Sequence, residues 1–374
     1  MAIRKHGRCS FSRILIRCLC RGHILKIQNP SILIYGDFRS DRLAASYQRA
    51  FTQLGYAVTP FCTEKIDKYL APWLAHRAGH RATIRSINFR RLGSFRWNRY
   101  FLSSVKQARP DLVFITNGDF LMPETLEQIR VLGIRVFIFH ADNPFPGNSA
   151  SRPEALPCAL ESDCYFIWSR YWCQRLQGIG VKRANYLGFA WDEELFPYVE
   201  LSEEPEHDVV FIGGWDEDRE AALTPIAARF KLRIWGPPYW IERTQPNSPL
   251  RHCWQGRALR GAEVSEVMAK SKIVLNSLRR QNLPDGVIMR TYEVPGCGGF
   301  MLSTRTEGAE REFPEGIAGA YFDSVQDCNA RIEYFLHNDQ VRRDIAREAH
   351  ETVKREHRYI NRAQTIIEAF RDII

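Results

Sequence analysis

Charged and polar side chains gather between residues 272 and 304. Two apolar runs typical of buried strands, Ile273–Leu275 and Phe300–Leu302, flank a segment that carries Asn276, Arg279, Arg280, Asp285, Arg290 and Glu293. Arginine holds a diphosphate through bidentate, charge-assisted bonds, and a carboxylate can accept hydroxyl bonds from a ribose. The same residues also fit a structural role, in which Glu293 interacts with its own helix dipole and the arginines are solvated or paired. Both interpretations stay open at this point.

The local pattern predicts where these side chains lie. A helix is expected to start near Arg290 or Thr291 and to end before Gly298-Gly299, which supply a C-terminal stop. This start places Pro295 close to the first turn, where its missing N–H costs little. We therefore expect Glu293 in the first turn and Asp285 in the preceding loop, near one edge of a cleft.

A second candidate site is the pair Gly213-Gly214, which follows an apolar strand over 208–212 and precedes a helix over 219–230. Glycines at such a turn let a phosphate approach backbone N–H groups at a helix N-terminus. The full G-x-G-x-x-G pattern is absent, and the acidic residues at 216–218 would repel an anion. A plain turn fits equally well.

The first half of the chain predicts three strands with polar residues at their carboxyl ends. The strands cover 32–35, 111–116 and 134–139. Ligands of open α/β sheets bind outside such ends, although Asp and Asn there also cap helices. A histidine near neutral pH can act as a general base that a carboxylate orients. The candidates are His140 and Asp142 for catalysis, and Asp37, Asn117 and Asp119 for the acceptor side.

Length and element order predict the domain organisation. A chain of 374 residues exceeds one ordinary core, and strands alternate with helices twice. We expect an α/β protein with two Rossmann-like domains, over 31–190 and 208–374, and a cleft between them. An acidic, proline-bearing linker covers 191–207, and closing helices cover 325–336, 340–353 and 361–370. No firm element is predicted for 63–100.

Charge and cysteine content exclude several classes of protein. Of the net charge of +9, residues 1–30 carry +7, so the nearly neutral remainder gives no footprint for nucleic acid. This basic extension is a poor secretory signal; it is either a disordered tail or a short amphipathic helix at an anionic membrane surface. The ten cysteines show no zinc or disulfide spacing, as in a cytoplasmic protein.

The central stretch resembles glycosyltransferases of the GT-B fold, and most closely the CgeB-like group. The similar motifs are Val274-Leu275-Asn276-Ser277-Leu278-Arg279, Met289 to Phe300, Phe211-Ile212-Gly213-Gly214, Leu232 to Gly236, and His357-Arg358-Tyr359 to Arg362. The resemblance covers residues from about 209 to the C-terminus, and it is looser over 32–190. Many GT-B transferases carry two donor-site glutamates separated by seven residues; Asp285 and Glu293 stand at these positions.

The resemblance implies a cytoplasmic enzyme that moves a sugar from a nucleotide donor to an unknown glycan, lipid-linked or protein acceptor. Glu293 would bind the ribose, Asp285 would lie near the sugar, and Arg279 or Arg290 would neutralise the diphosphate, with Asn276, Gly213, Gly214 and Gly298 completing the donor site. Arginines and helix N-termini would replace a metal, and no cofactor is expected. A sugar-nucleotide epimerase and a non-catalytic nucleotide-sugar-binding protein are the alternatives.

Overall fold

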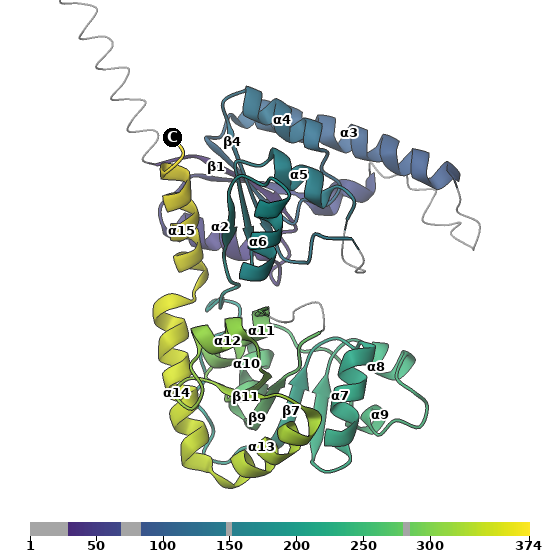
Figure 1. Cartoon of the computed structure of the whole chain (residues 1–374), viewed down its shortest axis with the longest axis vertical. Coiled ribbons are helices and arrows are strands. Elements are labelled where there is room, and N and C mark those ends of the chain that lie inside the picture. Colours follow the sequence, from purple (N-terminus) through teal and green to yellow (C-terminus); the bar gives the residue numbers. More distant parts are fainter. Residues whose placement is uncertain (1–28, 69–83, 147–151, 280–284) are drawn as a thin grey trace, which may run out of the picture.

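The computed structural model describes residues 29–68, 84–146, 152–279 and 285–374. Two α/β domains lie one above the other in Figure 1, and the C-terminal helices run along one side of both. Predictions that concern residues 1–28 and Arg280 fall outside the described residues. Within those ranges, no helix combines the length and hydropathy needed to cross a membrane.

The N-terminal domain is built on a six-stranded parallel sheet of order β2-β1-β3-β4-β5-β6. The sequences of its inner strands are continuous apolar runs, because helices cover both faces of a parallel sheet. Pro60 lies in β2, an edge strand, where its missing N–H costs no ladder bond. The strands are β1 (Ile32–Gly36), β2 (Val58–Cys62), β3 (Leu112–Thr116), β4 (Arg135–His140), β5 (Cys164–Ile167) and β6 (Ala184–Tyr186).

The longest helix of the N-terminal domain was not predicted from the sequence. Helix α3 (Ile84–Ala108) falls in the arginine- and aromatic-rich stretch where no element was expected. Trp97, Phe101 and Val105 are fully buried at a spacing of four, so the part of α3 with described side chains, residues 93–108, faces the core along a narrow stripe. The other helical elements are α2 (Leu43–Gln53), η1 (Thr63–Lys68), α4 (Pro123–Val131), α5 (Ala155–Glu161) and α6 (Arg170–Gly178).

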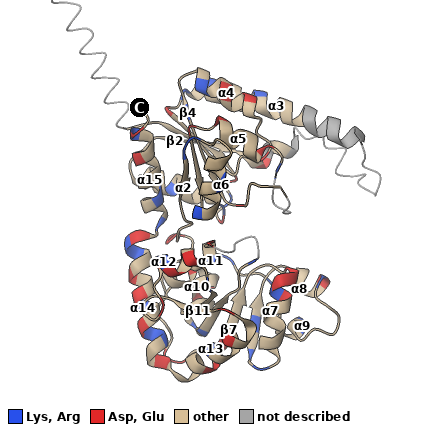
Figure 2. Ribbon diagram, in the orientation of Figure 1, with Lys and Arg blue, Asp and Glu red and all other residues tan. Residues whose placement is uncertain are grey.

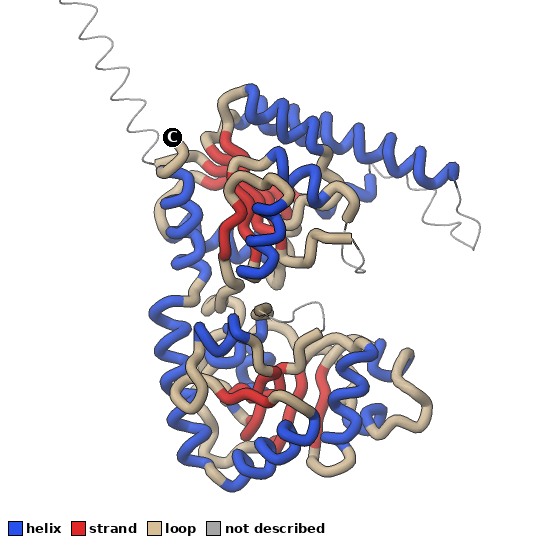
Figure 3. The backbone as a smooth tube through the Cα atoms, viewed as in Figure 1, coloured by secondary structure: helices blue, strands red, loops and turns tan. Residues whose placement is uncertain are grey.

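The C-terminal domain contains a second parallel sheet, of order β11-β10-β9-β7-β8 (Figure 3). Strand β11 was not predicted because it is only three residues long. The strands are β7 (His207–Ile212), β8 (Leu232–Trp235), β9 (Ser271–Asn276), β10 (Met301–Thr304) and β11 (Ala320–Phe322). Around them lie α7 (Glu217–Ala227), α8 (Tyr239–Glu242), α9 (Leu250–Cys253), α10 (Ala262–Ala269), α11 (Met289–Gly296), α12 (Glu307–Glu312), α13 (Val325–His337) and α14 (Asp339–Glu356).

The last helix returns to the N-terminal domain, although the sequence analysis grouped it with the C-terminal one. The ring of Tyr359, the first residue of α15 (Tyr359–Arg371), meets Tyr47 of α2 at a centroid distance of 5.2 Å. Near the other end of the helix, Phe370 lies 6.3 Å from Phe137 of β4. The apolar face of α15 therefore completes the N-terminal core.

The chain passes between the domains at two adjacent points. Trp191 pairs with Arg358 in an isolated parallel bridge, and the Trp191 N–H donates to the carbonyl of His357 at 2.8 Å. Acidic and basic side chains are interspersed along α14, which leads to this crossing (Figure 2). The two crossings therefore lie side by side and are hydrogen-bonded to each other.

Candidate functional site

Helix α11 presents a buried ion pair where it meets the carboxyl end of β7. Nη1 of Arg290 donates to Oε2 of Glu293, whose side chain is only 3% exposed. Nε of Arg290 donates to the carbonyl of Ile212 at 3.2 Å. Burial lowers the pKa of Arg290 to about 10, so the guanidinium remains charged at neutral pH. Among the described residues, Oε2 of Glu293 accepts the bond from Arg290, and no hydrogen bond to Oε1 is found.

The helix starts at Met289, slightly earlier than expected, so Glu293 lies beyond the first turn. The N–H of Ile288 instead donates to the hydroxyl of Thr291 at 3.2 Å. Pro295 lies near the end of the helix rather than in its first turn. Interaction with the dipole of its own helix therefore does not explain Glu293, because that effect fades within the first turn.

Two further arginines lie beside this pair, and sequence reasoning missed one of them. Arg219 of α7 donates to the carbonyl of Gly214 at 2.9 Å and to that of Ser277 at 3.3 Å. Burial lowers its pKa to about 10, and the charge of Arg279 adds to that effect. Arg219 ties the loop after β7 to the loop after β9. In the sequence, the motif Phe211 to Gly214 that resembles the family ends five residues before Arg219, and this proximity could have pointed to Arg219.

The acidic run after Gly214 has a structural task. Asp216 caps α7, accepting a bond from the Arg219 N–H at 3.0 Å. Its other oxygen accepts from Nε of Arg279 at 2.8 Å. The expected repulsion of an anion is therefore reduced, because Arg279 compensates the charge of Asp216. A Cβ at Gly214 would meet no atom within 4 Å, so the turn is open on this side.

Two residues of the predicted donor set are occupied by structural contacts. Asn276 is buried and donates to Ser303 at 3.1 Å and to Thr291 at 3.3 Å, which joins β9 to β10 and α11. Gly298 adopts a φ of +91°, as expected for the stop after α11, and a Cβ there would lie 2.5 Å from the carbonyl of Val199. Gly298 thus packs α11 against the linker.

Asp285, which was expected to lie near a bound sugar, contacts the opposite domain. Its side chain is 7% exposed, and Oδ2 accepts from the backbone N–H groups of Arg170 at 2.7 Å and Tyr171 at 3.3 Å. These are the first amides of α6 in the opposite domain. Oδ1 lies 3.4 Å from Nη1 of Arg311. The carboxylate therefore caps a helix across the domain interface.

The polar residues of the N-terminal domain lie along one sheet edge, because β1, β3 and β4 are neighbours. Asn117 accepts from the N–H of Ala141 at 2.8 Å and so fixes the loop after β4. His140 is 3% exposed, and Nδ1 contacts the backbone carbonyl of Asp142 at 2.9 Å. The backbone of Asp142, rather than its carboxylate, orients the ring.

Burial shifts the pKa values of this pair in opposite directions. Desolvation lowers the pKa of His140, which keeps the imidazole neutral and able to accept a proton. Desolvation also raises the pKa of the Asp142 carboxyl, and the charge of Arg279 partly offsets that rise. Arg279 of the C-terminal domain is thus near enough to affect the pKa of Asp142.

The remaining rim residues are engaged in ion pairs or backbone contacts. Asp37 accepts hydrogen bonds from the side chain and backbone of Arg39, which outweigh the effect of burial and lower its pKa. Asp119 lies 3.6 Å from Arg152, and its carbonyl accepts from the Tyr35 hydroxyl at 2.6 Å. Both carboxylates remain partly exposed.

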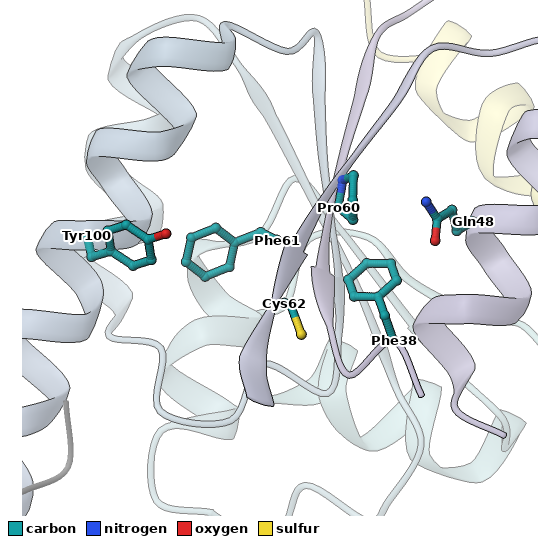
Figure 4. A pocket seen from close by; sticks show the side chains of 6 residues that line it. All are labelled: Phe38, Gln48, Pro60, Phe61, Cys62 and Tyr100. Carbon is teal, nitrogen blue, oxygen red and sulfur yellow. The ribbon is translucent and has the colours of Figure 1, made fainter. Parts of the chain in front are cut away.

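A cavity of about 310 Å³ lies in the N-terminal domain, across the edge strand β2 (Figure 4). Aromatic side chains of β2 and α3 form one wall, while Gln48 contributes an amide from α2. The lining residues are Phe38, Gln48, Pro60, Phe61, Cys62 and Tyr100. This cavity is built by the N-terminal domain alone and does not include the arginines of the C-terminal domain. Across the described ranges, no group of three His, Cys, Asp or Glu side chains is arranged to hold a metal.

Comparisons with known proteins identify the fold. Residues 219–368 match a family model described as "Glycosyl transferase-like". A search of curated proteins found no sequence match. Sucrose-phosphate synthase from Thermosynechococcus elongatus superimposes with a TM-score of 0.67 and 12% identity, covering 92% of this chain and 99% of that one.

Two other solved structures share the arrangement. Anabaena HepE in complex with UDP-glucose gives a TM-score of 0.57 at 13% identity, covering 91% of this chain and 99% of that one. A putative UDP-N-acetylglucosamine 2-epimerase from Listeria monocytogenes gives 0.51 at 9% identity, covering 87% and 94%. These likenesses confirm the predicted GT-B fold, and residues 219–368 are similar to the glycosyl transferase-like family. Membership of the CgeB-like group stays a prediction.

Proposed function

We propose that this protein is a glycosyltransferase that uses a nucleotide-sugar donor. The observation that supports this most strongly is the Arg290–Glu293 pair, which lies with Arg219 and Arg279 at the carboxyl ends of β7 and β9 inside the family-matched region. In open α/β sheets, ligands bind at this edge. HepE, which shares the fold, was solved with UDP-glucose.

In the proposed mechanism, each charged group has a separate task. Oε1 of Glu293 accepts a hydrogen bond from a ribose hydroxyl, while Arg290 holds the carboxylate in place through Oε2. Arg279, which is 42% exposed, leaves Asp216 to bind the diphosphate as charge develops on it. His140 of the N-terminal domain, held neutral by burial, takes the proton of the attacking acceptor hydroxyl.

The reaction balances without a further reactant. A bond forms between the acceptor oxygen and the anomeric carbon, the bond from that carbon to the diphosphate breaks, and the acceptor proton passes to His140. Because arginines neutralise the leaving group, we propose that turnover is independent of a divalent metal. Assay of sugar transfer with and without EDTA tests this step, and loss of turnover in EDTA would contradict it.

A sugar-nucleotide epimerase is the second candidate, since a putative epimerase shares the fold. The two functions differ in their need for an acceptor. Radiolabelled UDP-, GDP-, ADP- and dTDP-sugars incubated with and without a panel of glycan and lipid acceptors distinguish them. Transfer of label to an acceptor supports the proposal. Conversion of the donor sugar without any acceptor would favour the epimerase, and binding without conversion would favour a binding protein.

A further inference from the structure

A buried carboxylate joins the two domains directly behind helix α11. Glu312, the last residue of α12, has a side chain that is 10% exposed. Oε2 accepts from the hydroxyl of Tyr292 at 2.7 Å, and Oε1 accepts from that of Tyr186. Tyr292 lies on α11, whereas Tyr186 ends β6 of the N-terminal domain. One side chain therefore links the sheet of one domain to a helix of the other.

The surroundings hold these bonds in one geometry. Burial raises the pKa of both tyrosines, so each hydroxyl keeps its proton and donates it to Glu312. A Cβ at Gly188 would lie 2.5 Å from the Tyr292 hydroxyl, which shows how closely the N-terminal backbone approaches α11. The guanidinium of Arg170 stacks over the ring of Tyr186 at 3.9 Å.

A histidine that is neutral at neutral pH lies beside the Glu312 carboxylate. Nδ1 of His357 is 3.5 Å from Oε2, but burial lowers the His357 pKa to about 4, so this contact is not an ion pair at neutral pH. Nδ1 instead accepts from Arg362 at 2.9 Å. Arg362 also donates to the carbonyl of Gly188 at 3.0 Å. Burying a carboxylate among neutral partners is costly, which makes this cluster a poor device for stability alone.

We propose that Glu312 is a positioning residue that sets the angle of α11 against the N-terminal domain. This inference rests on the proposed function, because α11 carries Arg290 and Glu293 and the N-terminal sheet edge carries His140. The chain crosses between the domains at Trp191 and Arg358. Glu312 and its two tyrosines restrict rotation of the domains about this crossing, beside the helix that is proposed to hold the donor.

The test compares Glu312→Gln with Glu307→Gln, which removes an exposed charge from the same helix. Small-angle scattering of the unliganded full chain should show a larger radius of gyration for Glu312→Gln only. Because the donor contacts remain, UDP affinity should change by less than about threefold, or about 0.6 kcal/mol. Transfer should slow by about 100-fold, as expected for a misplacement of roughly 1 Å.

Two further variants distinguish a change in domain angle from misfolding of the Glu312→Gln protein. Tyr186→Phe and Tyr292→Phe each remove one hydroxyl and keep the carboxylate, and each should give a smaller change in the same direction. An unchanged radius of gyration in all three variants would overturn the inference. Scattering needs no substrate, so this outcome is separate from failure of the proposed function, which would appear as an absence of nucleoside diphosphate binding to the wild-type protein.

Discussion

Replacing Asp285 with alanine should loosen the contact between the two domains at helix α6. The change removes the acceptor of the N–H groups of Arg170 and Tyr171, at 2.7 Å and 3.3 Å. Loss of a side-chain cap costs about 0.5–2 kcal/mol, and a hydrogen bond to a charged group about 1.5–3 kcal/mol. The ion pair with Arg311 adds little because that side chain is 45% exposed. We expect a total of about 2 kcal/mol.

Hydrogen exchange measures this effect at the affected amides. A cost of about 2 kcal/mol corresponds to roughly 30-fold faster exchange for a peptide that covers residues 169–172. Asp285→Asn retains one acceptor oxygen and should fall between alanine and the wild type. Glu307→Ala, an exposed change in the same domain, serves as the control. Unchanged exchange in Asp285→Ala would refute the capping role. A loss of catalysis in Asp285→Asn without altered exchange would favour a position at the donor sugar instead.

Three further outcomes are expected. Gly298→Ala should lower the free energy of unfolding by about 1–3 kcal/mol in urea titrations, because its φ of +91° and the carbonyl of Val199 at 2.5 Å leave no room for a Cβ; an unchanged midpoint would contradict the packing described. His357 has a pKa lowered by burial from 6.5 to about 4. Between pH 6.5 and pH 4, His357 is therefore protonated in the unfolded chain but not in the native state. The free energy of unfolding keeps its full value above pH 6.5 and decreases as the pH falls towards 4, by roughly 2 kcal/mol at pH 5. His357→Gln should flatten that slope, and an identical slope would contradict the burial effect. Arg219→Lys should weaken nucleotide binding measured by calorimetry, because an ammonium cannot span the carbonyls of Gly214 and Ser277 as a guanidinium does; wild-type affinity would reject that bridging role.

The sequence predicted the sheet-forming strands well because parallel strands buried on both faces are continuous apolar runs. It predicted the rim that carries Asn117 and His140 for the same reason, since strand ends fix which residues share an edge. Helix α3 was missed because Trp97, Phe101 and Val105 form only a narrow buried stripe amid arginines.

Contacts between residues that are distant in the sequence could not be predicted from motif spacing. Seven residues separate Asp285 from Glu293 along the chain, but the Asp285 carboxylate contacts α6 of the other domain. In the sequence, Arg219 is one charged residue among several at the start of a helix. The fold brings its guanidinium to the carbonyl of Ser277. The pairing of Glu312 with Tyr186 spans 126 residues and left no local signal.

Binding of nucleoside diphosphates to wild-type protein, Arg279→Ala and Arg229→Ala tests the central claim most directly. Arg279 pairs with Asp216 at the start of α7, whereas Arg229 makes a comparable exposed pair with Glu333 on the same domain. Calorimetry with UDP, GDP, ADP and dTDP should show one preferred ligand, bound about tenfold more weakly by Arg279→Ala, or about 1.4 kcal/mol, and unchanged by Arg229→Ala. If none of the four nucleotides bound to the wild-type protein, or if Arg279→Ala and Arg229→Ala bound the preferred nucleotide equally well, a donor site at this edge of the sheet would be contradicted.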